Sequence, residues 1–335
     1  MSATGKILEE NLDVLIVGAG MTGLTAASEL RRAGRSVVLL DKGRGVGGRM
    51  ATHRIGRATF DHGAQFFTAR DPRFAAAIEN WQEIGIAAEW SRGITAEADG
   101  HARWRGQPGM TAVPKHLAHG LSVRTETKVV SLGQEAEHWW VETETGEVFR
   151  AGALLLTAPV PQSLALLDAG RIPLQPEIRA SLTSIIYERC LTVLAVLAGP
   201  PRVPAPGGFA PTGGPITWTA DNQQKGISTE PAVTIHASQA FSLERWDRDR
   251  AASGRLLLEA AQQWLGAQVL EFEVHGWRYS KPLRVAEQPC MILSTGPPLV
   301  LAGDAFAGPR VEGAALSGWA AAEALLESDA MVPRA

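Results

Sequence analysis

Cysteine, tyrosine and long apolar runs are scarce in this chain of 335 residues. The two cysteines, Cys190 and Cys290, lie far apart and form no Cys-x-x-Cys pattern, so we expect neither a disulfide framework nor a thiolate metal site. A charge-free run at 151–167 is interrupted by Pro159 and Pro161 and is short for a bilayer. We therefore expect no membrane span.

An excess of charge of one sign is lacking as well. The chain has 32 Lys and Arg against 35 Asp and Glu, which gives no overall attraction to nucleic acid or to anionic lipid. The first residues include acidic side chains where a signal peptide needs an apolar stretch, so we expect a cytoplasmic protein. With 45% hydrophobic and 20% charged residues, the composition is typical of a globular protein. The length of 335 residues predicts about two domains. We expect a monomer or a dimer.

A glycine-rich turn near the start of the chain has the pattern of a dinucleotide-binding site. In "VLIVGAGMTGLTAASEL", an apolar strand at 12–17 leads into Gly18, Gly20 and Gly23 and then into a helix predicted at 22–33. Gly18 permits the tight turn, Gly20 lets the backbone approach a pyrophosphate, and Gly23 lets helix and strand pack closely. The helix N-terminus then attracts the phosphates.

Asp41 follows a second apolar strand, at 36–40, about twenty residues after the glycines. A carboxylate there can accept hydrogen bonds from both hydroxyls of the adenosine ribose. It would repel a 2′-phosphate, so NADP is disfavoured at this site. A glycine-rich turn alone often does no more than start a helix. Here strand, turn, helix, strand and acid fall in order, so we predict a bound dinucleotide.

Two further segments favour FAD over NAD, because the flavin half of FAD needs protein contacts that NAD does not. "GVGGRM" provides Gly47 and Gly48 for close backbone approach and Arg49 for phosphate charge. "LVLAGDAFAGPRVEGAAL" repeats the strand, turn and helix design, with Asp304 for a ribityl or phosphate-adjacent group. The helix that follows, predicted at 312–327, can point its N-terminus at the flavin and stabilise negative charge on the reduced ring.

The rest of the chain gives a coarser pattern. The pattern of residues predicts a helix at 74–86, a helix near 250–265 and an apolar strand at 298–302. The alternation of polar and apolar residues in the stretch that begins at Val123 predicts an antiparallel meander that ends in a buried strand at 153–157. From 159 to 274 there is no strand–helix–strand rhythm, and "AGPPRVPAPGGFAPTGGP" is expected to be an ordered loop. This segment is the candidate substrate domain.

The motifs "VGAGMTGL", "DKGRGVGGRMAT", "DHGAQFFTARD" and "RVEGAALSG" together resemble the flavoproteins of the amine oxidase superfamily, most closely bacterial renalases. The resemblance runs from Asp13 to Leu326, and "GAQFFTARD", "GRMAT", "TIHASQ" and "HGWRYSKP" are more specific to the renalase branch. It implies an α/β fold. A Rossmann-like FAD-binding domain of the amine oxidase type, at 1–75, 105–159 and 276–335, would hold an inserted α+β substrate domain at 76–104 and 160–275.

The resemblance also implies an activity. Renalases bind FAD non-covalently and oxidise isomeric dihydronicotinamide dinucleotides, 2- or 6-dihydro-NAD(P), in which the hydride is on a wrong ring carbon. Hydride transfer to flavin N5 would return NAD(P)⁺, and dioxygen would reoxidise the flavin with release of hydrogen peroxide. The ring nitrogen of a dihydropyridine already expels the hydride, so placement matters more than acid–base groups, and the lack of an evident catalytic triad is expected.

The motifs and the resemblance together assign the residues expected to contact FAD. They are Gly18, Gly20, Met21, Thr22, Gly23, Asp41, Lys42, Gly47, Gly48, Arg49, Met50, Gly63, Ala64, Gln65, Val129, Gly303, Asp304, Arg310, Val311, Glu312, Gly313 and Ala314.

On the substrate side, His236 in "AVTIHASQAF" is the leading residue. It lies in an alternating strand and could hydrogen-bond a carboxamide; a histidine that only supports the core is the alternative. The matching histidine of renalases lies in the pocket over the flavin. Gln65 and Phe66 should lie near the flavin, and since many relatives have tyrosine at the second position, a hydroxyl hydrogen bond is lost here. Trp277 and Tyr279 could form a pocket wall or only pack.

Several other features are weaker candidates. Asn222 in "TADNQQK" is included in the substrate-side set, although Asp-Asn pairs are common in turns. His116 and His119 have helical spacing, but without further ligands we expect no metal there. Lys281 and Arg284 would suit a dinucleotide phosphate or could be only a solvated face.

Two alternatives remain open. A flavin amine oxidase commonly flanks its amine with two aromatic rings, and the two tyrosines here, Tyr187 and Tyr279, would both be needed. Such enzymes also commonly carry a lysine near flavin N5, for which the sequence offers no clear candidate. A non-catalytic protein like the Rab GDP-dissociation inhibitors is the second alternative, and the intact Asp41 and Asp304 argue against it.

Overall fold

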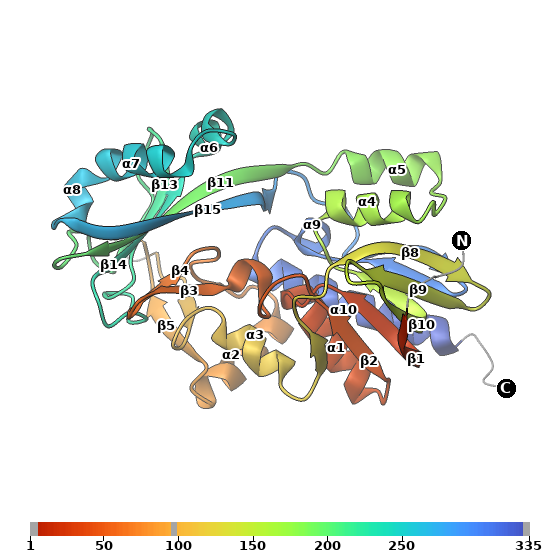
Figure 1. The fold of residues 1–335 in the computed structure, drawn as a ribbon. Helices are drawn as coiled ribbons and strands as arrows, with labels where there is room; N and C mark the ends of the chain where they lie inside the picture. The colour runs from red at the N-terminus through yellow and green to blue at the C-terminus, as the bar shows by residue number, and fades with distance from the viewer. Residues whose placement is uncertain (1–5, 95–98, 331–335) are drawn as a thin grey trace. The chain divides into compact units, whose positions relative to one another are not determined.

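A computed structural model describes residues 6–94 and 99–330 (Figure 1). The chain folds into two compact units that share it discontinuously. Unit 1 consists of Met1–Gly48, Pro114–Ile186 and Pro282–Ala335, and unit 2 of Arg49–Val113 and Tyr187–Lys281. No helix within the described ranges is both long enough and apolar enough to span a membrane.

Unit 1 is built on an eight-stranded sheet. Its path runs β16 (Met291–Thr295), β17 (Pro298–Leu301), β10 (Glu147–Leu156), β1 (Lys6–Val17), β2 (Val37–Leu40) and β7 (Ser122–Arg124), with β9 (His138–Thr143) beside β10 and β8 (Val129–Glu135) beside β9. The pairs among β17, β10, β1, β2 and β7 are parallel, whereas β16, β8 and β9 join by antiparallel pairing. The predicted strand–helix–strand start is confirmed, and so is the predicted meander for β8, β9 and β10, whereas its first residues belong to β7 and pair in parallel with β2.

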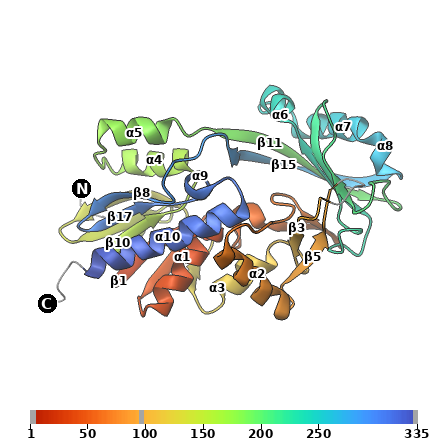
Figure 2. The same cartoon turned by 180° about the vertical axis from the view of Figure 1, so that it is seen from behind.

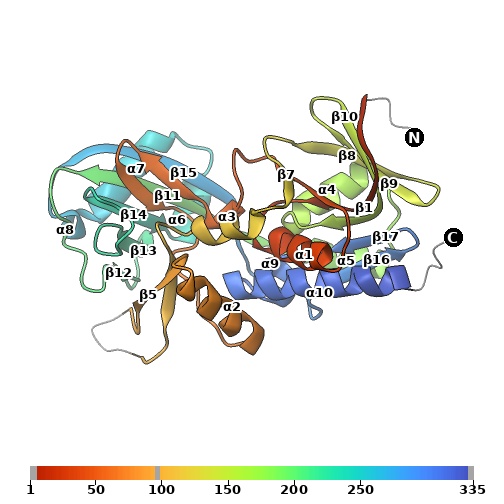
Figure 3. The same ribbon diagram turned by 90° about the horizontal axis from the view of Figure 1, so that it is seen from below.

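The parallel strands are apolar because helices and loops exclude water from them. Leu15 and Ile16 of β1 and Leu154–Leu156 of β10 are fully buried, as expected for a sheet covered on both faces. Helices α1 (Met21–Arg32) and α10 (Val311–Ala330) lie side by side on the sheet (Figures 2 and 3). Their close approach requires Gly318, since a Cβ there would collide with the Thr25 hydroxyl of α1.

Unit 2 is built on a five-stranded antiparallel sheet. Its order is β12 (Gly208–Phe209), β13 (Ile216–Asp221), β14 (Ala232–Ala237), β11 (Tyr187–Leu197) and β15 (Val269–Pro282). Helices α6 (Gln239–Arg245), α7 (Arg250–Ala260) and α8 (Gln262–Leu265) cover one face in Figure 1, where Val233 and Ile235 of β14 join an apolar cluster. Side chains alternate along a strand, so Thr234 and His236 lie on the opposite face.

That opposite face of the unit 2 sheet is covered by smaller elements. The hairpin of β3 (Thr52–Ile55) and β4 (Ala58–Asp61) packs Phe60 against Leu194 and Ala232. The rest of unit 2 includes α2 (Pro72–Glu83) and the hairpin of β5 (Ala87–Ser91) and β6 (Arg103–Gly106), while α3 (Ala112–Ala118) crosses the boundary between the units in the sequence.

Most predicted elements match the structure to within three residues, but the first strand, predicted at 12–17, begins at Lys6. The helix predicted at 74–86 begins earlier, at Pro72, because the Asp71 side chain accepts hydrogen bonds from the Arg73 and Phe74 amides and caps it. The buried strand predicted at 153–157 is the second half of β10. The first half pairs with β9 and the second with β17 along the same edge of β10.

The compact units differ from the predicted domain ranges at 49–75, 105–113, 160–186 and 276–281, of which the last, predicted in the FAD-binding domain, is the end of β15 and lies in unit 2. Residues 49–75 and 105–113, predicted in the FAD-binding domain, lie in unit 2, because the β3–β4 hairpin packs against its sheet. Residues 160–186, predicted in the substrate domain, lie in unit 1, where α4 (Val160–Ala169) packs against β8 and α5 (Pro176–Thr183) against α4. Which unit binds FAD and which binds substrate stays a prediction.

Candidate functional site

The three glycines after β1 have the conformations that the sequence predicts. Gly18 has φ +113°, a backbone conformation that favours glycine, and a Cβ there would collide with the Thr157 hydroxyl. A Cβ on Gly23 would collide with the Gly18 carbonyl oxygen, so the third glycine sets the contact between helix and strand. At Gly20 a Cβ would meet no atom within 4 Å. Open space at the helix start is what an approaching pyrophosphate requires.

The start of α1 is suited to bind an anion. Gly20 is its N-cap and supplies no side-chain hydrogen bond to the first turn, so the amides there are left for another acceptor. Met21, Thr22 and Gly23 of that turn are buried against the rest of unit 1. The Thr22 hydroxyl donates to the Ala314 carbonyl oxygen at 2.8 Å, which places the first turn of α1 beside the first turn of α10.

Asp41 lies at the end of β2, and both carboxylate oxygens accept backbone hydrogen bonds. Oδ2 accepts from the Ala19 amide at 2.7 Å and Oδ1 from the Gly43 amide at 2.7 Å. Each oxygen has a second lone pair, so the predicted bonds from the ribose hydroxyls are compatible with these contacts. Asp41 is therefore also a structural residue that joins the glycine turn to the following loop.

The "GVGGRM" loop returns to the glycine turn within unit 1. The Gly47 amide donates to the Ala19 carbonyl oxygen at 2.8 Å, and Gly47 and Gly48 have positive φ angles of 108° and 53°. The neighbouring Lys42 is exposed. Val129, at the start of β8, is buried and pairs with Thr143.

The C-terminal turn repeats the design of the first one. Gly303 follows β17 with φ +151°, and its amide donates to the Ser317 hydroxyl of α10 at 2.8 Å. Asp304 begins the short helix α9 (Asp304–Ala307) and is buried. A Cβ on Gly313 would collide with the Gly308 carbonyl oxygen, so this glycine lets α10 start close to the turn. Val311 and Glu312 are buried, Ala314 is partly buried, and Arg310 is exposed.

These features of unit 1 fit a dinucleotide of the FAD type. Two strand–glycine–helix turns have adjacent helix N-termini, and the first of them leaves its amides and the space around Gly20 open. The remaining predicted cofactor residues, Arg49, Met50, Gly63, Ala64 and Gln65, belong to unit 2. There the Ala64 amide donates to the Arg49 carbonyl oxygen at 2.8 Å, and the Arg49 guanidinium lies 3.3 Å from the Tyr279 carbonyl oxygen.

His236, the predicted substrate-side residue, lies at the centre of a polar cluster in unit 2. Its Nε2 is 3.2 Å from the His62 carbonyl oxygen and 3.4 Å from Gln65 Nε2. Gln65 Nε2 already donates to the Asp61 and Gly63 carbonyl oxygens at 2.6 and 3.1 Å, which uses both of its hydrogens. We therefore assign the proton of the imidazole to Nε2, which donates to His62 and leaves Nδ1 as an acceptor.

Two acceptors in this cluster have no partner among the described residues. Gln65 Oε1 is buried without a hydrogen bond, and His236 Nδ1 makes none. The pKa of His236 is lowered to about 4: burial lowers it most, the hydrogen bond to the His62 carbonyl opposes this effect, and the charge of nearby Lys225 adds to it. His236 is therefore neutral at neutral pH and remains partly accessible.

A second group of imidazoles stands beside this cluster. The ring centroid of His62 is 4.9 Å from that of His275, 5.9 Å from that of His53 and 5.0 Å from that of Trp277. The Trp277 indole donates to the His62 carbonyl oxygen at 2.9 Å. Burial, followed by the neighbouring His275, lowers the pKa of His62 to about 3. Within the described ranges no cluster of three or more such side chains has the geometry to hold a metal ion.

Asp61 and Lys225 form a fully buried ion pair that the sequence analysis missed. Lys225 Nζ lies 2.7 Å from Asp61 Oδ2, and neither side chain is exposed. Asp61 Oδ1 also accepts from the Thr52 hydroxyl at 2.7 Å and from the Met110 amide at 2.8 Å. Burial lowers the pKa of Lys225, and Asp61 opposes that effect.

Phe66 is part of an aromatic group with Trp90 and Trp218. The ring centroids are separated by 5.7–6.2 Å, and Trp218 lies directly opposite His236 on the neighbouring strand. Lys225 Nζ is 5.3 Å from the Trp90 ring. The structure thus brings Phe66, Gln65, His236 and Trp277 together in unit 2, while their role on the substrate side stays a prediction.

Asn222 and Tyr279 have contacts of a different kind. Asn222 is fully buried, and its Nδ2 donates to the Ala232 carbonyl and the Thr234 hydroxyl, so it supports the turn after β13. Tyr279 meets Tyr187 edge to face at 5.6 Å between ring centroids. Two rings in contact leave no space for an amine between them.

The weaker candidates and the two cysteines differ in their exposure and contacts. His116 and His119 are exposed. Burial raises the pKa of Cys190 to about 11 and also raises that of Cys290, which makes both thiols less reactive than a free cysteine. Lys281 lies 3.5 Å from Glu188, and Arg284 is exposed.

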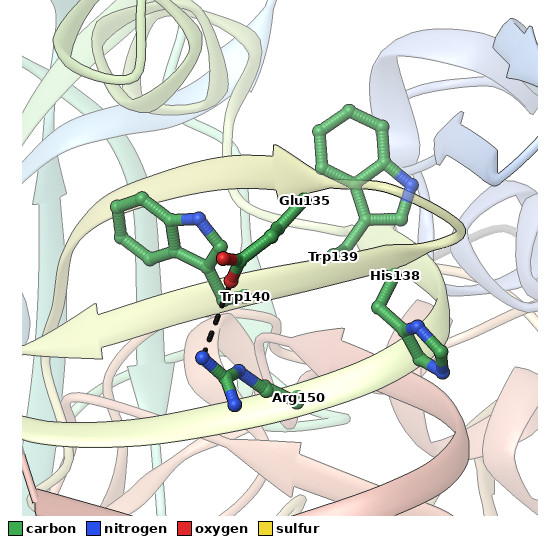
Figure 4. Close-up of a pocket in the computed structure, with 5 residues that line it drawn as sticks. All are labelled: Glu135, His138, Trp139, Trp140 and Arg150. Atoms are coloured by element: carbon green, nitrogen blue, oxygen red, sulfur yellow. Dashed lines mark hydrogen bonds and ion pairs between the residues drawn. The ribbon is translucent and has the colours of Figure 1, made fainter. Parts of the chain in front are cut away.

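Unit 1 also has an open pocket of about 200 Å³ on its β8–β9 hairpin (Figure 4). Its lining residues are Glu135, His138, Trp139, Trp140 and Arg150, and the Arg150 guanidinium donates to Glu135 at 3.2 Å. None of these residues belongs to the predicted site.

Comparison with known families identifies the fold. The family model described as an NAD(P)-binding Rossmann-like domain matches residues 16–81. The family model of the flavin-containing amine oxidoreductases matches residues 74–326, which is most of the chain. The chain belongs to the flavin-containing amine oxidoreductase family. The family implies a flavin cofactor, which agrees with the two glycine turns of unit 1.

Individual relatives match over shorter stretches. A Mycobacterium tuberculosis protein named as a flavin-containing monoamine oxidase, AofH, is 39% identical over 75 residues, which are 22% of this chain and 16% of that protein. An L-amino-acid oxidase from Echis ocellatus is 52% identical over 42 residues, 12% of this chain and 8% of that protein. The matches therefore span a small part of these curated relatives.

Solved structures match over nearly the whole chain. Putrescine oxidase superposes with a TM-score of 0.71 at 15% identity, covering 96% of this chain and 100% of that chain. A protein from Exiguobacterium sp. 255-15 named as a protoporphyrinogen oxidase gives a TM-score of 0.71 at 14% identity, again over 96% and 100%. At such identities the likeness shows the fold alone, an α/β fold with a Rossmann-like FAD-binding domain.

Proposed function

We propose that this family member is an FAD-dependent oxidase of isomeric dihydronicotinamide dinucleotides, with dioxygen as the acceptor and NAD(P)⁺ and hydrogen peroxide as products. FAD would be held non-covalently, with its pyrophosphate at the start of α1 and its ribose at Asp41. When bound, FAD supplies the two-electron acceptor for the reaction.

The observation that carries the proposal is the set of charges around His236. The buried carboxylate on this side of the unit 2 sheet, Asp61, already contacts Lys225, and a second cation, Arg105, is half-buried nearby. His236 and His62 are neutral because burial lowers their pKa values to about 4 and about 3. Asp61 is occupied by Lys225, and the exposed Glu273 by His53, so the described residues of unit 2 place an ammonium substrate here among cations, which is unfavourable. A neutral dihydropyridine ring on a phosphate-bearing ligand suits these charges.

The unpartnered acceptors of the cluster suit a nicotinamide carboxamide. Its NH₂ group has two hydrogens to donate, and Gln65 Oε1 and His236 Nδ1 are two acceptors on side chains whose Nε2 atoms lie 3.4 Å apart. In this proposal both residues orient the ring, and the neutral imidazole adds no charge that would oppose departure of a hydride from the substrate.

A flavin amine oxidase is the second candidate, since the named relatives are amine and amino-acid oxidases and Lys225 is a buried lysine. Against it, the two tyrosines that would have to flank the amine contact each other directly. A non-catalytic binding protein of the same architecture is the third candidate. Purified protein that is colourless and takes up no added FAD would support that third candidate.

The deciding experiment is anaerobic mixing of the FAD-loaded protein with separate substrates while flavin absorbance is followed. We expect 2- and 6-dihydro-NAD(P) to bleach the flavin within seconds, while putrescine, an aromatic monoamine and ordinary NADH leave it oxidised over the same time. Bleaching by an amine with the dihydronicotinamide isomers inert would transfer the assignment to the amine oxidases.

A further inference from the structure

Arg105 of β6 is a cation without a direct partner. It is half-buried in unit 2, its Nη1 is fully buried, and no nitrogen of its guanidinium is hydrogen-bonded or ion-paired to a residue of the described ranges. Burial lowers the pKa of Arg105 more than the charge of Asp61 raises it. An arginine in this state has lost water without gaining an acceptor, which is unfavourable unless a ligand supplies one.

Asp61 does not neutralise Arg105. Its oxygens already accept from Lys225, Thr52 and Met110, and three donors around one carboxylate suit its ionised form. The Asp61–Lys225 pair thus has no net charge, and Arg105 adds one positive charge to the neighbourhood. The nearby imidazoles His62 and His236 add none, because burial keeps them neutral.

The neighbouring arginine on the same face of β6 is in the opposite situation. Arg103 lies two residues before Arg105, and its two terminal nitrogens each donate to a carboxylate oxygen of Asp99 at 2.6 Å. The Arg103 guanidinium lies 5.9 Å from the Phe66 ring. One arginine of the strand is therefore paired within the protein, and the other is left with its donors unused.

Aromatic side chains contact two neighbours of Arg105: Arg103 on the same strand and Lys225, whose pKa the charge of Arg105 lowers. Phe66 and Trp90 are only partly buried, with ring centroids 6.1 Å apart, and both contact the same neighbourhood through Arg103 and Lys225. The indole nitrogen of Trp218, 5.7 Å from Phe66 between ring centroids, is a second buried donor without an acceptor. Planar rings beside unused donors suit an aromatic ligand that carries an anionic group.

We propose that Arg105 binds a phosphate group of a planar aromatic ligand that lies against Phe66 and Trp90. The inference deepens the proposed function and rests on it in one respect: in a dihydronicotinamide dinucleotide, the phosphate would be that of the nicotinamide nucleotide half. Arg105 would then select nucleotides over nucleosides, and anionic over cationic substrates, before any electron is transferred.

The test compares ligands that differ only in the phosphate. Calorimetry on the FAD-loaded protein would measure binding of nicotinamide mononucleotide and nicotinamide riboside, and of phenyl phosphate and phenol as a pair without nicotinamide. The wild type is expected to bind the phosphate-bearing member of each pair about tenfold more tightly or better, as for a charge-assisted pair of hydrogen bonds. In Arg105→Gln the ratio of the two affinities within each pair, called the phosphate ratio, is expected to fall to about one.

Arg92→Gln is the matched control, because Arg92 follows β5 at the same hairpin, is well exposed and, among the residues that the structure describes, pairs with Glu89. It should keep the wild-type ratio. Arg105→Lys keeps the charge but loses the guanidinium fork, and a ratio several-fold below that of the wild type is expected. If Arg105→Gln fails to fold, Arg105→Lys is the deciding variant. A phosphate ratio in Arg105→Lys equal to that of the wild type would then overturn the proposal.

Other outcomes separate this inference from the proposed function. Inorganic phosphate alone should bind far more weakly than phenyl phosphate; equal affinity would overturn the aromatic part of the proposal. If the dihydronicotinamide isomers fail to reduce the flavin while the phosphate ratio still depends on Arg105, the proposed function is wrong and the anion site stands. If they reduce it while Arg105→Gln leaves the ratio unchanged, the anion site is wrong and the function stands.

Discussion

Lys225 Nζ lies 2.7 Å from Asp61 Oδ2 with both side chains fully buried. The two residues join the turn after β13 to the end of β4, so the pair connects the unit 2 sheet to the hairpin that covers it. The same pair fixes the charges near His236, because Asp61 is occupied and cannot bind a substrate cation. If the proposed function is right, this one contact links stability to substrate selection.

Breaking this pair should be strongly destabilising. Lys225→Met leaves the Asp61 carboxylate buried without its cation, for which we expect a loss of about 3–5 kcal/mol in the free energy of unfolding, measured by denaturant titration. The double variant Asp61→Asn with Lys225→Met should recover part of the loss, since it leaves no buried charge.

The matched control for that experiment is Lys128→Met. Lys128 pairs with Glu144 at the same 2.7 Å, but both side chains are more than half exposed. The loss there should be below about 1 kcal/mol. A loss in Lys225→Met as small as in Lys128→Met would show that the buried pair does not stabilise unit 2.

Stability should fall as the pH falls below about 6.5. The folded-state pKa values of His62 and His236 are about 3 and about 4, whereas a histidine of the unfolded chain titrates near 6.5. Between these values the unfolded state binds more protons, so each histidine lowers the free energy of unfolding by up to about 1.4 kcal/mol per pH unit. Above about 6.5 the histidines are neutral in both states and add no pH dependence.

Denaturant titrations of His62→Gln from pH 4.5 to 8 would check this effect. Without the histidine, the curve of unfolding free energy against pH should be less steep below pH 6.5 than that of the wild type. The exposed His119→Gln should leave the curve unchanged. Parallel curves for His62→Gln and the wild type would contradict the low pKa of His62.

The sequence predicts much of unit 1 and little of the neighbourhood of Arg105. The glycine turns are local: the backbone angle of Gly18 and the packing of Gly23 depend on residues within one strand and one helix. The Asp61–Lys225 pair joins residues 164 positions apart, and nothing in "DNQQKGIS" indicates that its lysine is buried. Likewise, Arg103 and Arg105 are alike in the sequence, and only the fold shows which of them has a partner.

His236→Ala should retain FAD but reduce the flavin more slowly with dihydronicotinamide isomers. Loss of one hydrogen bond that orients the ring predicts a decrease of about five- to tenfold in the anaerobic reduction rate, measured by stopped-flow absorbance. His236→Asn retains an acceptor near the position of Nδ1 and should keep more of the rate. Rates equal to the wild type in both variants would remove His236 from the substrate site.

The two glycines at the start of α1 separate FAD binding from folding. At Gly20, with φ −82°, a methyl group meets no atom within 4 Å, so Gly20→Ala should change the stability of the apoprotein by less than about 1 kcal/mol. The methyl would lie where the pyrophosphate is predicted to approach the helix. FAD affinity, measured by quenching of flavin fluorescence, should therefore drop about tenfold or more.

Gly23→Ala should affect stability directly and FAD binding only indirectly. Its Cβ would collide with the Gly18 carbonyl oxygen, and because both are backbone positions, α1 would have to move away from β1. We expect the apoprotein to lose about 1–3 kcal/mol of stability, with weaker FAD binding following from the displaced helix. If Gly20→Ala binds FAD as tightly as the wild type while Gly23→Ala is destabilised as expected, the turn is only structural and the pyrophosphate binds elsewhere.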